Sequence, residues 1–241
     1  MNVFYACILT LCLASLTLNA NVPISKKPNH SDWNMLLKKH VASNGDVNYK
    51  SFQKDRKALA IYLKELAVNS PSDDWSQQEK LAYYINLYNA ATVQLVIDNY
   101  PLKSIKNLKS PWDKEWIKIG ENRVSLGQIE HKILRKMKEP RIHFAINCAS
   151  YSCPKLFNEA FTPEQIENQL QKAATHFIND PKKNHLSTDA VQLSLIFKWY
   201  KEDFTEKASL IAYINSYAEI PIPSNAKINY LQYDWRLNES K

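Results

Sequence analysis

One long helical pattern constrains this chain more than any other part of its sequence. Ser76 followed by Glu79 is typical of a capping box, which satisfies free backbone N–H groups at the start of a helix. Residues for a buried face then recur at three- and four-residue steps, at Leu81, Tyr84, Ile85, Tyr88, Thr92, Leu95 and Val96. The spacing predicts a wide apolar face on a helix that ends at Tyr100-Pro101, because proline cannot continue it. We expect this helix to lie at the centre of the fold.

The rest of the chain mixes helical patterns with extended ones. Only three glycines occur, which favours regular structure over long loops. Apolar spacing predicts helices over 31–41, where Ser31 is the expected cap, and over 52–68, 126–137, 162 onward and 208–217. Alternation predicts a hairpin over 116–126, a second one around Thr188-Asp189, a buried strand over 141–147 and an extended segment over 228–235. The predicted class is α+β: a helix-rich single domain with a central buried helix and a small, mainly antiparallel sheet built from hairpins.

The first twenty residues differ from all that follow. Val3 to Leu18 is uncharged and almost entirely apolar, and Leu18-Asn19-Ala20 ends in a small residue, as at a signal-peptidase site. We therefore predict a signal peptide over 1–20, a lead-in over 21–30 and one domain over 31–241. The protein is expected to be exported, either periplasmic or secreted. Lipoprotein anchoring through Cys12 is less favoured, because bulky Leu11 precedes it where a small residue is expected.

Charge limits the partners that the sequence suggests. The formal net charge of +7 lies wholly after residue 20, but the lysines form separate short clusters rather than one stripe. Such a surface favours an anionic small-molecule, peptide or envelope partner without specifying nucleic-acid binding. No later stretch is long and apolar enough for a membrane-spanning helix, so no transmembrane segment is expected after cleavage.

Several stretches resemble one known family. They are Tyr84 to Ala90, Arg141 to Cys148 continuing to Ser152-Cys153-Pro154, Ile196 to Phe204, and the closing Tyr230 to Trp235. In order and content they are similar to the domain-of-unknown-function 547 (DUF547) family, over nearly the whole chain after the leader. Ala149 departs from the glycine that the resemblance leads us to expect. The resemblance implies no activity.

Cys148 is the residue most suited to chemistry, because it follows the predicted strand over 141–147. A thiolate there would attack a carbonyl or a sulfur atom if an imidazole took its proton. His131, beside Glu130 on the preceding helix, is the preferred partner. His143 is the alternative, although on a strand it would point away from Cys148. Cys148, His131 and Glu130 are therefore the candidate catalytic residues for cysteine-dependent acyl transfer or hydrolysis.

Four further residues are candidates for binding: Asn86, Asn89, His143 and Ser152. Asn86 or Asn89 would orient the imidazole or donate to an oxyanion. The structural alternative is that these two amides hold exposed backbone, since buried amides need partners. Lys198, Trp199 and Tyr200 would line a pocket in one interpretation, but an aromatic cluster at this spacing favours the core, and the same is expected of the other tryptophans.

The pair Cys148 and Cys153 has other possible roles as well. In an oxidising compartment the two form a small-loop disulfide in a non-catalytic envelope-binding module, or a redox pair, or they stay buried thiols. Their spacing with His131 and His143 matches no zinc-ligand pattern, so no metal is predicted. Because no glycine-rich phosphate loop, Gly-x-Ser-x-Gly elbow or His-Glu-x-x-His helix occurs, no cofactor is predicted either.

Overall fold

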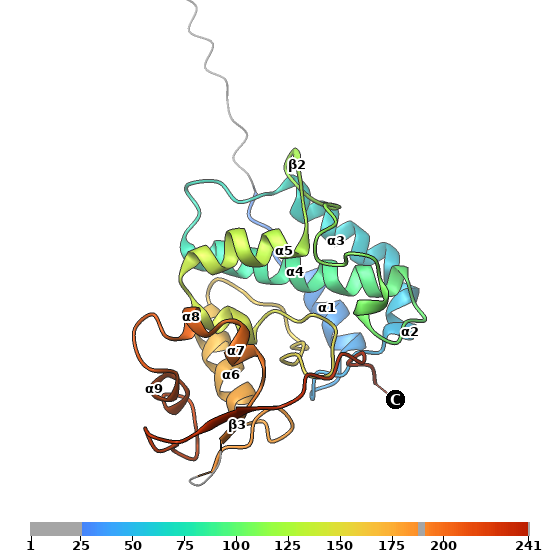
Figure 1. The fold of residues 1–241 in the computed structure, drawn as a ribbon. Coiled ribbons are helices and arrows are strands. Elements are labelled where there is room, and N and C mark those ends of the chain that lie inside the picture. The colour runs from blue at the N-terminus through green and yellow to red at the C-terminus, as the bar shows by residue number, and fades with distance from the viewer. Residues whose placement is uncertain (1–25, 188–190, 241) are drawn as a thin grey trace, which may run out of the picture.

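Helix α4 (Gln77–Asp98) runs through the middle of the fold, as its sequence pattern predicts (Figure 1). The computed structural model describes residues 26–187 and 191–240, so the predicted signal peptide over 1–20 lies outside the described residues. The capping box is present: Glu79 N–H donates to Ser76 Oγ at 3.2 Å, and Ser76 N–H donates to Glu79 Oε2 at 2.8 Å. Fifteen of the 22 residues are buried, so α4 is covered on most sides rather than on one face.

The N-terminal helices form a layer beside α4. They are α1 (Ser31–His40), α2 (Tyr49–Phe52), the 3-10 turn η1 (Gln53–Asp55) and α3 (Arg56–Val68). Helices α2 and α3 contact α4, and α1 packs on α2 and α3. The helices predicted over 31–41 and 52–68 are confirmed, although His30 rather than Ser31 occupies the N-cap position of α1. Trp33 of α1 stacks on Tyr62 of α3 with ring centroids 5.9 Å apart, which joins the two helices.

A second helical layer follows the predicted first hairpin. The 3-10 turn η2 (Ile105–Asn107) precedes strands β1 (Ile117–Ile119) and β2 (Asn122–Val124), which pair antiparallel as expected. The helix predicted over 126–137 is confirmed. It is one continuous helical segment with three kinds of turn: α5 (Leu126–Gln128), the π-helical η3 (Ile129–Ile133) and the 3-10 η4 (Leu134–Met137). All three contact α4, so this helical segment forms a second layer beside it.

The C-terminal third combines helices with a parallel strand pair. Helix α6 (Ile166–Asn179) packs on α4 and is followed by β3 (Val191–Leu193), α7 (Ile196–Trp199), α8 (Lys201–Phe204), α9 (Leu210–Asn215) and β4 (Ile228–Tyr230). His185 and Gln192 pair antiparallel, at the position of the predicted second hairpin, whose turn at 188–190 lies outside the described residues. Strand β3 also pairs with β4 in a parallel register, which the sequence pattern does not indicate. The helix-rich α+β class is confirmed.

The strand predicted over 141–147 is wrong. Residues Pro140–Phe144 form the 3-10 helix η5, and no strand includes 145–147. Pro140 suits the first turn of a helix, and the Glu139 side chain accepts from Arg141 N–H at 3.0 Å, so the turn is capped. The apolar run gave the appearance of a strand because Ile142, His143 and Phe144 are all buried against α6 and the core.

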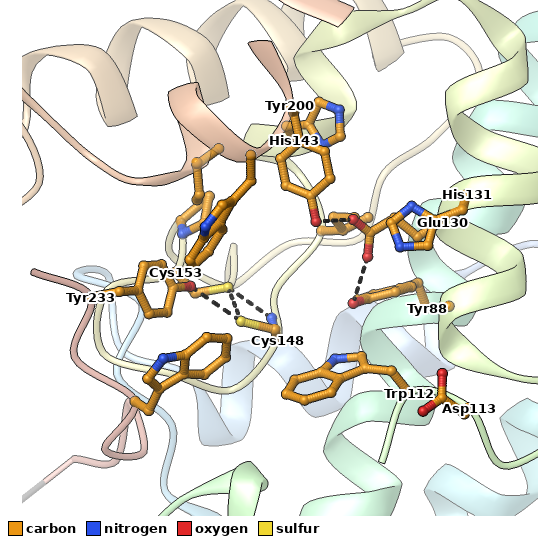
Figure 2. A pocket seen from close by; sticks show the side chains of 16 residues that line it. Tyr88, Trp112, Asp113, Glu130, His131, His143, Cys148, Cys153, Tyr200 and Tyr233 are labelled. Carbon is orange, nitrogen blue, oxygen red and sulfur yellow. Dashed lines mark hydrogen bonds between the residues drawn. The ribbon is translucent and has the colours of Figure 1, made fainter. Parts of the chain in front are cut away.

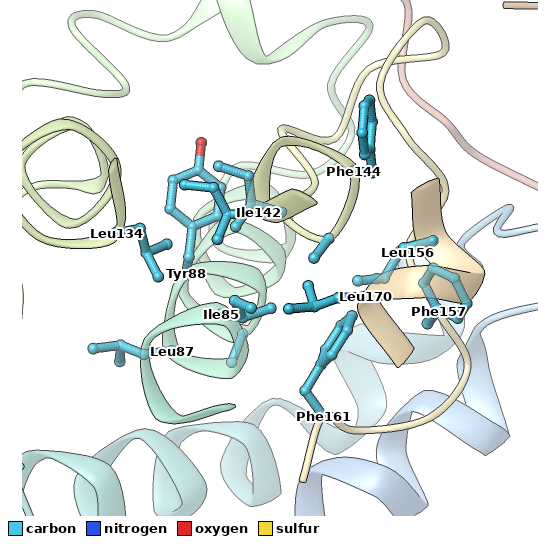
Figure 3. Close-up of a cluster of buried hydrophobic side chains, with 14 of the residues drawn as sticks. Ile85, Leu87, Tyr88, Leu134, Ile142, Phe144, Leu156, Phe157, Phe161 and Leu170 are labelled. Carbon is cyan, nitrogen blue, oxygen red and sulfur yellow. The ribbon is translucent and has the colours of Figure 1, made fainter. Parts of the chain in front are cut away.

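One hydrophobic core joins these layers (Figure 3). Around α4 it includes Ile85, Leu87, Leu134, Ile142, Phe144, Leu156, Phe161 and Leu170, all of them buried. The last stretch of chain crosses the molecule beyond β4 and is bonded to its N-terminal part, since Tyr49 OH donates to Asn238 Oδ1 at 2.7 Å (Figure 1). Within the described ranges, no helix is both long and apolar enough to cross a membrane.

Two buried amides on α4 hold the irregular segments beside it. Asn89 Nδ2 donates to Ala145 C=O at 3.0 Å, and Asn89 Oδ1 accepts from Asn147 N–H at 2.8 Å. Asn86 binds both backbone groups of Phe161 in the same way, at 2.7 and 3.0 Å. Each carboxamide pairs as a peptide group of a neighbouring strand would, so segments without a strand partner still have their backbone satisfied.

Replacing Asn89 with alanine is expected to lower the free energy of unfolding by about 2–5 kcal/mol. The change leaves the Ala145 carbonyl and the Asn147 N–H buried without partners, at about 1–3 kcal/mol each. Urea titration followed by circular dichroism measures the loss. The matched control is Asn99→Ala at the exposed end of α4, where the amide donates to Leu95 C=O near water. A loss no larger than in this control would contradict the role given to Asn89.

Gly45→Ala is expected to destabilise the fold more than Gly120→Ala does. Both glycines have positive φ, +90° and +56°, so both substitutions strain the backbone. At Gly45 the new Cβ would also lie 2.3 Å from Lys155 Cβ and 3.0 Å from Lys155 Cα, whereas at Gly120 the nearest atom is Ser70 Oγ at 3.3 Å. The added overlap predicts a further loss of about 1–3 kcal/mol. Equal midpoints in thermal unfolding of the two variants would refute this close approach.

Candidate functional site

A cavity of about 350 Å³ lies where α4, the helical segment α5–η3, α7 and the C-terminal segment meet (Figure 2). Six of its lining residues are tyrosine or tryptophan, and Cys148 and Cys153 both belong to its wall. The lining residues are Tyr88, Trp112, Asp113, Gly127, Glu130, His131, His143, Ile146, Cys148, Cys153, Pro154, Ile196, Trp199, Tyr200, Tyr233 and Trp235. A concave, largely apolar space with a few polar groups is the usual form of a small-molecule site.

The loop that carries the cysteines is held in place by Asn147. Its Oδ1 accepts from Ala149 N–H at 2.8 Å, and its Nδ2 donates to the Pro154 carbonyl at 2.7 Å. These two bonds draw the ends of the loop together. Ala149 has a φ of +60°, in the left-handed region that favours glycine, which gives a physical reason for glycine at this position. The buried Ala149 is therefore a strained residue directly after Cys148.

The two cysteines face one another in this loop. Cys148 Sγ lies 2.6 Å from Cys153 Sγ, and both cysteines are free. The Cys148 N–H donates to Cys153 Sγ at 2.9 Å. Ser150 Oγ at 3.1 Å and Tyr233 OH at 3.4 Å also contact Cys148 Sγ. The sulfur atoms are thus placed for direct exchange of bonds with one another.

The two thiols differ in acidity and exposure. The hydrogen bond from Cys153 outweighs burial and, with those from Ser150 and Tyr233, lowers the pKa of Cys148 to about 7. Burial raises the pKa of Cys153 well above its ordinary value, and proximity to Cys148 adds to the rise. Cys148 is half-buried, whereas Cys153 is buried. Cys148 is therefore the sulfur that ionises first and the more exposed of the two, and the thiolate is the nucleophilic form.

His131 lines the same cavity as Cys148 but is not bonded to its sulfur. The residue is exposed in the middle of η3, and Arg135 donates to its Nδ1 from 3.4 Å. The partners of Cys148 Sγ among the described residues are Cys153, Ser150 and Tyr233. The pairing of Cys148 with His131 therefore stays a prediction.

His143 belongs to a separate network behind Tyr200. It lies on η5, not on a strand, and its Nε2 hydrogen-bonds to Asp203 Oδ2 at 2.7 Å. The ring stacks on Tyr200 with centroids 3.9 Å apart. Burial alone would raise the pKa of Asp203, but hydrogen bonds from His143 and Arg135 lower it overall. His143 is thus fixed in place by a carboxylate and an aromatic ring at the back of the cavity wall.

Glu130 occupies the wall between two phenols. It is buried on the π-helical turn η3 and accepts hydrogen bonds from Tyr88 OH at 3.2 Å and from Tyr200 OH (Figure 2). Burial, together with the charge of Glu130, raises the pKa of both tyrosines, so both remain neutral donors. Short π-helical segments are frequent at functional sites, and this one carries Glu130 and His131.

The other predicted binding residues have structural partners. Asn86 and Asn89 lie in the core and hold backbone, outside the set of residues that line the cavity. Ser152 Oγ accepts from Asp234 N–H at 2.8 Å, which ties the cysteine loop to the C-terminal segment. Their role in binding stays a prediction. Among residues 26–187 and 191–240, no three His, Cys, Asp or Glu side chains come together as a metal site would require.

Sequence reasoning missed most of the aromatic wall. Trp199 is 46% exposed rather than buried in the core as expected, and it packs on Tyr233 with centroids 4.8 Å apart. Trp235 lies between Trp199, at 6.0 Å, and Trp112, at 5.7 Å. The stretches 196–204 and 230–235 carried the available signal, because both were part of the family resemblance while lying far from the cysteines in sequence.

Comparison with known proteins agrees with that resemblance. No curated protein and no solved structure matches the chain. Residues 72–178 match the family model described as "Protein of unknown function, DUF547". The match covers α4, the cysteine loop and α6, whereas the stretches 196–204 and 230–235 lie beyond it. Over this segment, which holds the central helix, Cys148 and Cys153, the chain is similar to the DUF547 family.

Proposed function

We propose that the chain is a thiol–disulfide exchange protein in which Cys148 attacks and Cys153 resolves. The single observation that carries this proposal is the contact of the two free sulfur atoms, 2.6 Å apart, in the wall of an open cavity. The difference between the two thiols supports it. A half-buried thiol of low pKa beside a buried thiol of high pKa suits one attacking and one resolving cysteine.

The exchange proceeds in two balanced steps. In the reduced protein, the Cys148 thiolate attacks one sulfur of a substrate disulfide, forms a mixed disulfide and releases the other substrate sulfur as a thiolate. Cys153 then loses its proton to that thiolate and attacks Cys148 Sγ. The Cys148–Cys153 bond forms, and the second substrate thiolate leaves and takes up the proton that Cys148 gave to solvent. Two electrons pass from the protein to the substrate, and the reverse sequence oxidises a dithiol substrate.

Two rival functions use the same residues. Cysteine-dependent acyl transfer or hydrolysis would need His131, which lines the same cavity, to reach Cys148 when a substrate binds. A non-catalytic envelope-binding module would keep Cys148 and Cys153 as a permanent disulfide. Thiol exchange is favoured over acyl transfer because Cys148 Sγ bonds to its neighbouring sulfur and to no imidazole within the described residues. It is favoured over a permanent disulfide because both cysteines are free and both line the cavity. Export to the periplasm or beyond remains a prediction from the leader.

Alkylation of the reduced protein should reveal the low pKa of Cys148. Because the pKa of Cys148 is lowered to about 7, its iodoacetamide rate should fall by half as the pH drops to about 7. In Cys153→Ala the largest cause of that lowering is removed, so the midpoint should move up toward the ordinary thiol value of about 8.5. Ser150→Ala removes a lesser hydrogen bond and should move it less. Identical midpoints in wild type and Cys153→Ala would rule out the coupling between the two thiols.

Trapping with glutathione disulfide tests the exchange itself. Cys153→Ala should accumulate a glutathione adduct on Cys148, because the resolving thiol is gone. Cys148→Ala should form at least tenfold less adduct, since Cys153 is buried and of high pKa. Wild type should instead form the Cys148–Cys153 bond and release two glutathione thiols per chain. Peptide mass spectrometry measures all three products.

The same assay separates the rivals. A Cys148–Cys153 bond that dithiothreitol cannot reduce in the folded protein would overturn exchange in favour of a structural disulfide. Labelling of Cys148 by an acyl-thioester probe that is lost in His131→Ala, without any Cys148–Cys153 bond under glutathione disulfide, would overturn it in favour of acyl transfer. Lys132→Ala, on the same turn as His131, is the matched control for that variant.

A further inference from the structure

The cavity wall contains a buried carboxylate without a direct cationic partner. Glu130 is 6% exposed and accepts one phenolic hydrogen bond on each oxygen, from Tyr88 and from Tyr200. Among the described residues, no Lys, Arg or His nitrogen lies within 4 Å of its carboxylate. Because each oxygen has two lone-pair positions, each retains one for a further donor. Burying an unpaired carboxylate costs free energy, and a cation that binds beside it offsets part of that cost.

The nearby basic groups are already engaged elsewhere. The Arg135 guanidinium makes two hydrogen bonds to Asp203, at 2.6 and 2.8 Å, and lies over the Tyr200 ring at 5.5 Å. It also donates to His131 Nδ1 at 3.4 Å. Arg135 therefore has its own carboxylate partner and is not among the residues that line the cavity. The Glu130 charge remains directed toward the cavity.

The remaining wall is built of rings that attract cations. Trp199 and Trp235 stack 6.0 Å apart, and Tyr233 lies 4.5 Å from Trp235. The faces of such rings carry negative electrostatic potential, so they bind ammonium groups by cation–π contact. Lys106 Nζ lies over the Trp235 ring at 5.1 Å, so one of these rings already makes such a contact. Although the chain has a net charge of +7, the lining contains Glu130 and Asp113 but no lysine or arginine.

We propose that this cavity binds an organic ammonium group, primary or quaternary, with Glu130 as its charge partner and the tryptophans as its walls. A volume of about 350 Å³ suits a small molecule or one side chain rather than a folded domain. The inference deepens the proposed exchange function and rests on it in one respect: the substrate sulfur would belong to a molecule that carries this cation. Binding itself requires neither cysteine.

Nuclear magnetic resonance of the six tryptophan indole N–H groups tests the site directly. A Cys148→Ser, Cys153→Ser chain removes all exchange chemistry, and the reduced wild type is titrated beside it. Choline and butylammonium are the quaternary and primary probes. Their neutral controls are dimethylbutanol, in which carbon replaces the charged nitrogen, and butanol. The signals of Trp112, Trp199 and Trp235 should shift with a cation, whereas those of the core residues Trp33 and Trp75 should not.

Affinity comparison identifies the charge partner. Each cation should bind at least tenfold more tightly than its neutral control, and Glu130→Gln should remove that preference while leaving the neutral control unchanged. Glu121→Gln, in the exposed turn between β1 and β2, should behave as wild type. Unchanged Trp33 and Trp75 signals verify that each variant is folded. Of the two probes, the tighter binder identifies the kind of ammonium that the cavity prefers.

Three outcomes would overturn the inference. Equal affinity for a cation and its neutral control would make the cavity merely apolar. Cation shifts that persist at full strength in Glu130→Gln would assign the charge preference to another group. An absence of shifts at Trp112, Trp199 and Trp235 in both chains would leave no cation site. None of these results depends on thiol exchange, so a failed exchange assay with intact cation binding would overturn only the proposed function.

Discussion

The carboxamide of Asn89, buried against the loop that leads to Cys148, is the contact on which the site depends. It pairs with both the Ala145 carbonyl and the Asn147 N–H, and thereby replaces the strand that this segment lacks. Asn147 then closes the next loop by bonding Ala149 and Pro154. The position of the sulfur atoms thus follows from a chain of amide contacts that starts on the most buried helix of the fold.

The cavity has two chemically different sides. On one, Cys148 and Cys153 share a contact that makes one thiol acidic and leaves the other protonated. On the other, Glu130 lies between Tyr88 and Tyr200, and Trp112 lines the same cavity (Figure 2). A site with a nucleophilic sulfur and a separate charged anchor would hold a substrate at two points, which is how binding orients a reacting atom.

Local sequence signals identified the helices well and the segment before Cys148 poorly. The capping box at Ser76 and the hairpin around Gly120 depend on neighbouring residues, so their patterns could be read directly. The segment 141–147 could not, because a buried apolar run is compatible with a strand or with a short helix. Pro140, the Glu139 cap and the amide of Asn89 favour the short helix over the strand. Asn89 lies on another helix, so its effect is not visible in the local sequence.

The sequence by itself determined the central helix, the α+β class, the similarity to the DUF547 family, and Cys148 as the residue to examine, because these are encoded in short-range patterns. Only the tertiary structure decided which groups surround the sulfur. Tyr233 lies 85 positions from Cys148, and Tyr200 lies 70 from Glu130, yet each is a direct contact. Such contacts arise when α4 is buried on most sides and the C-terminal segment packs back over it, which no periodicity along the chain predicts.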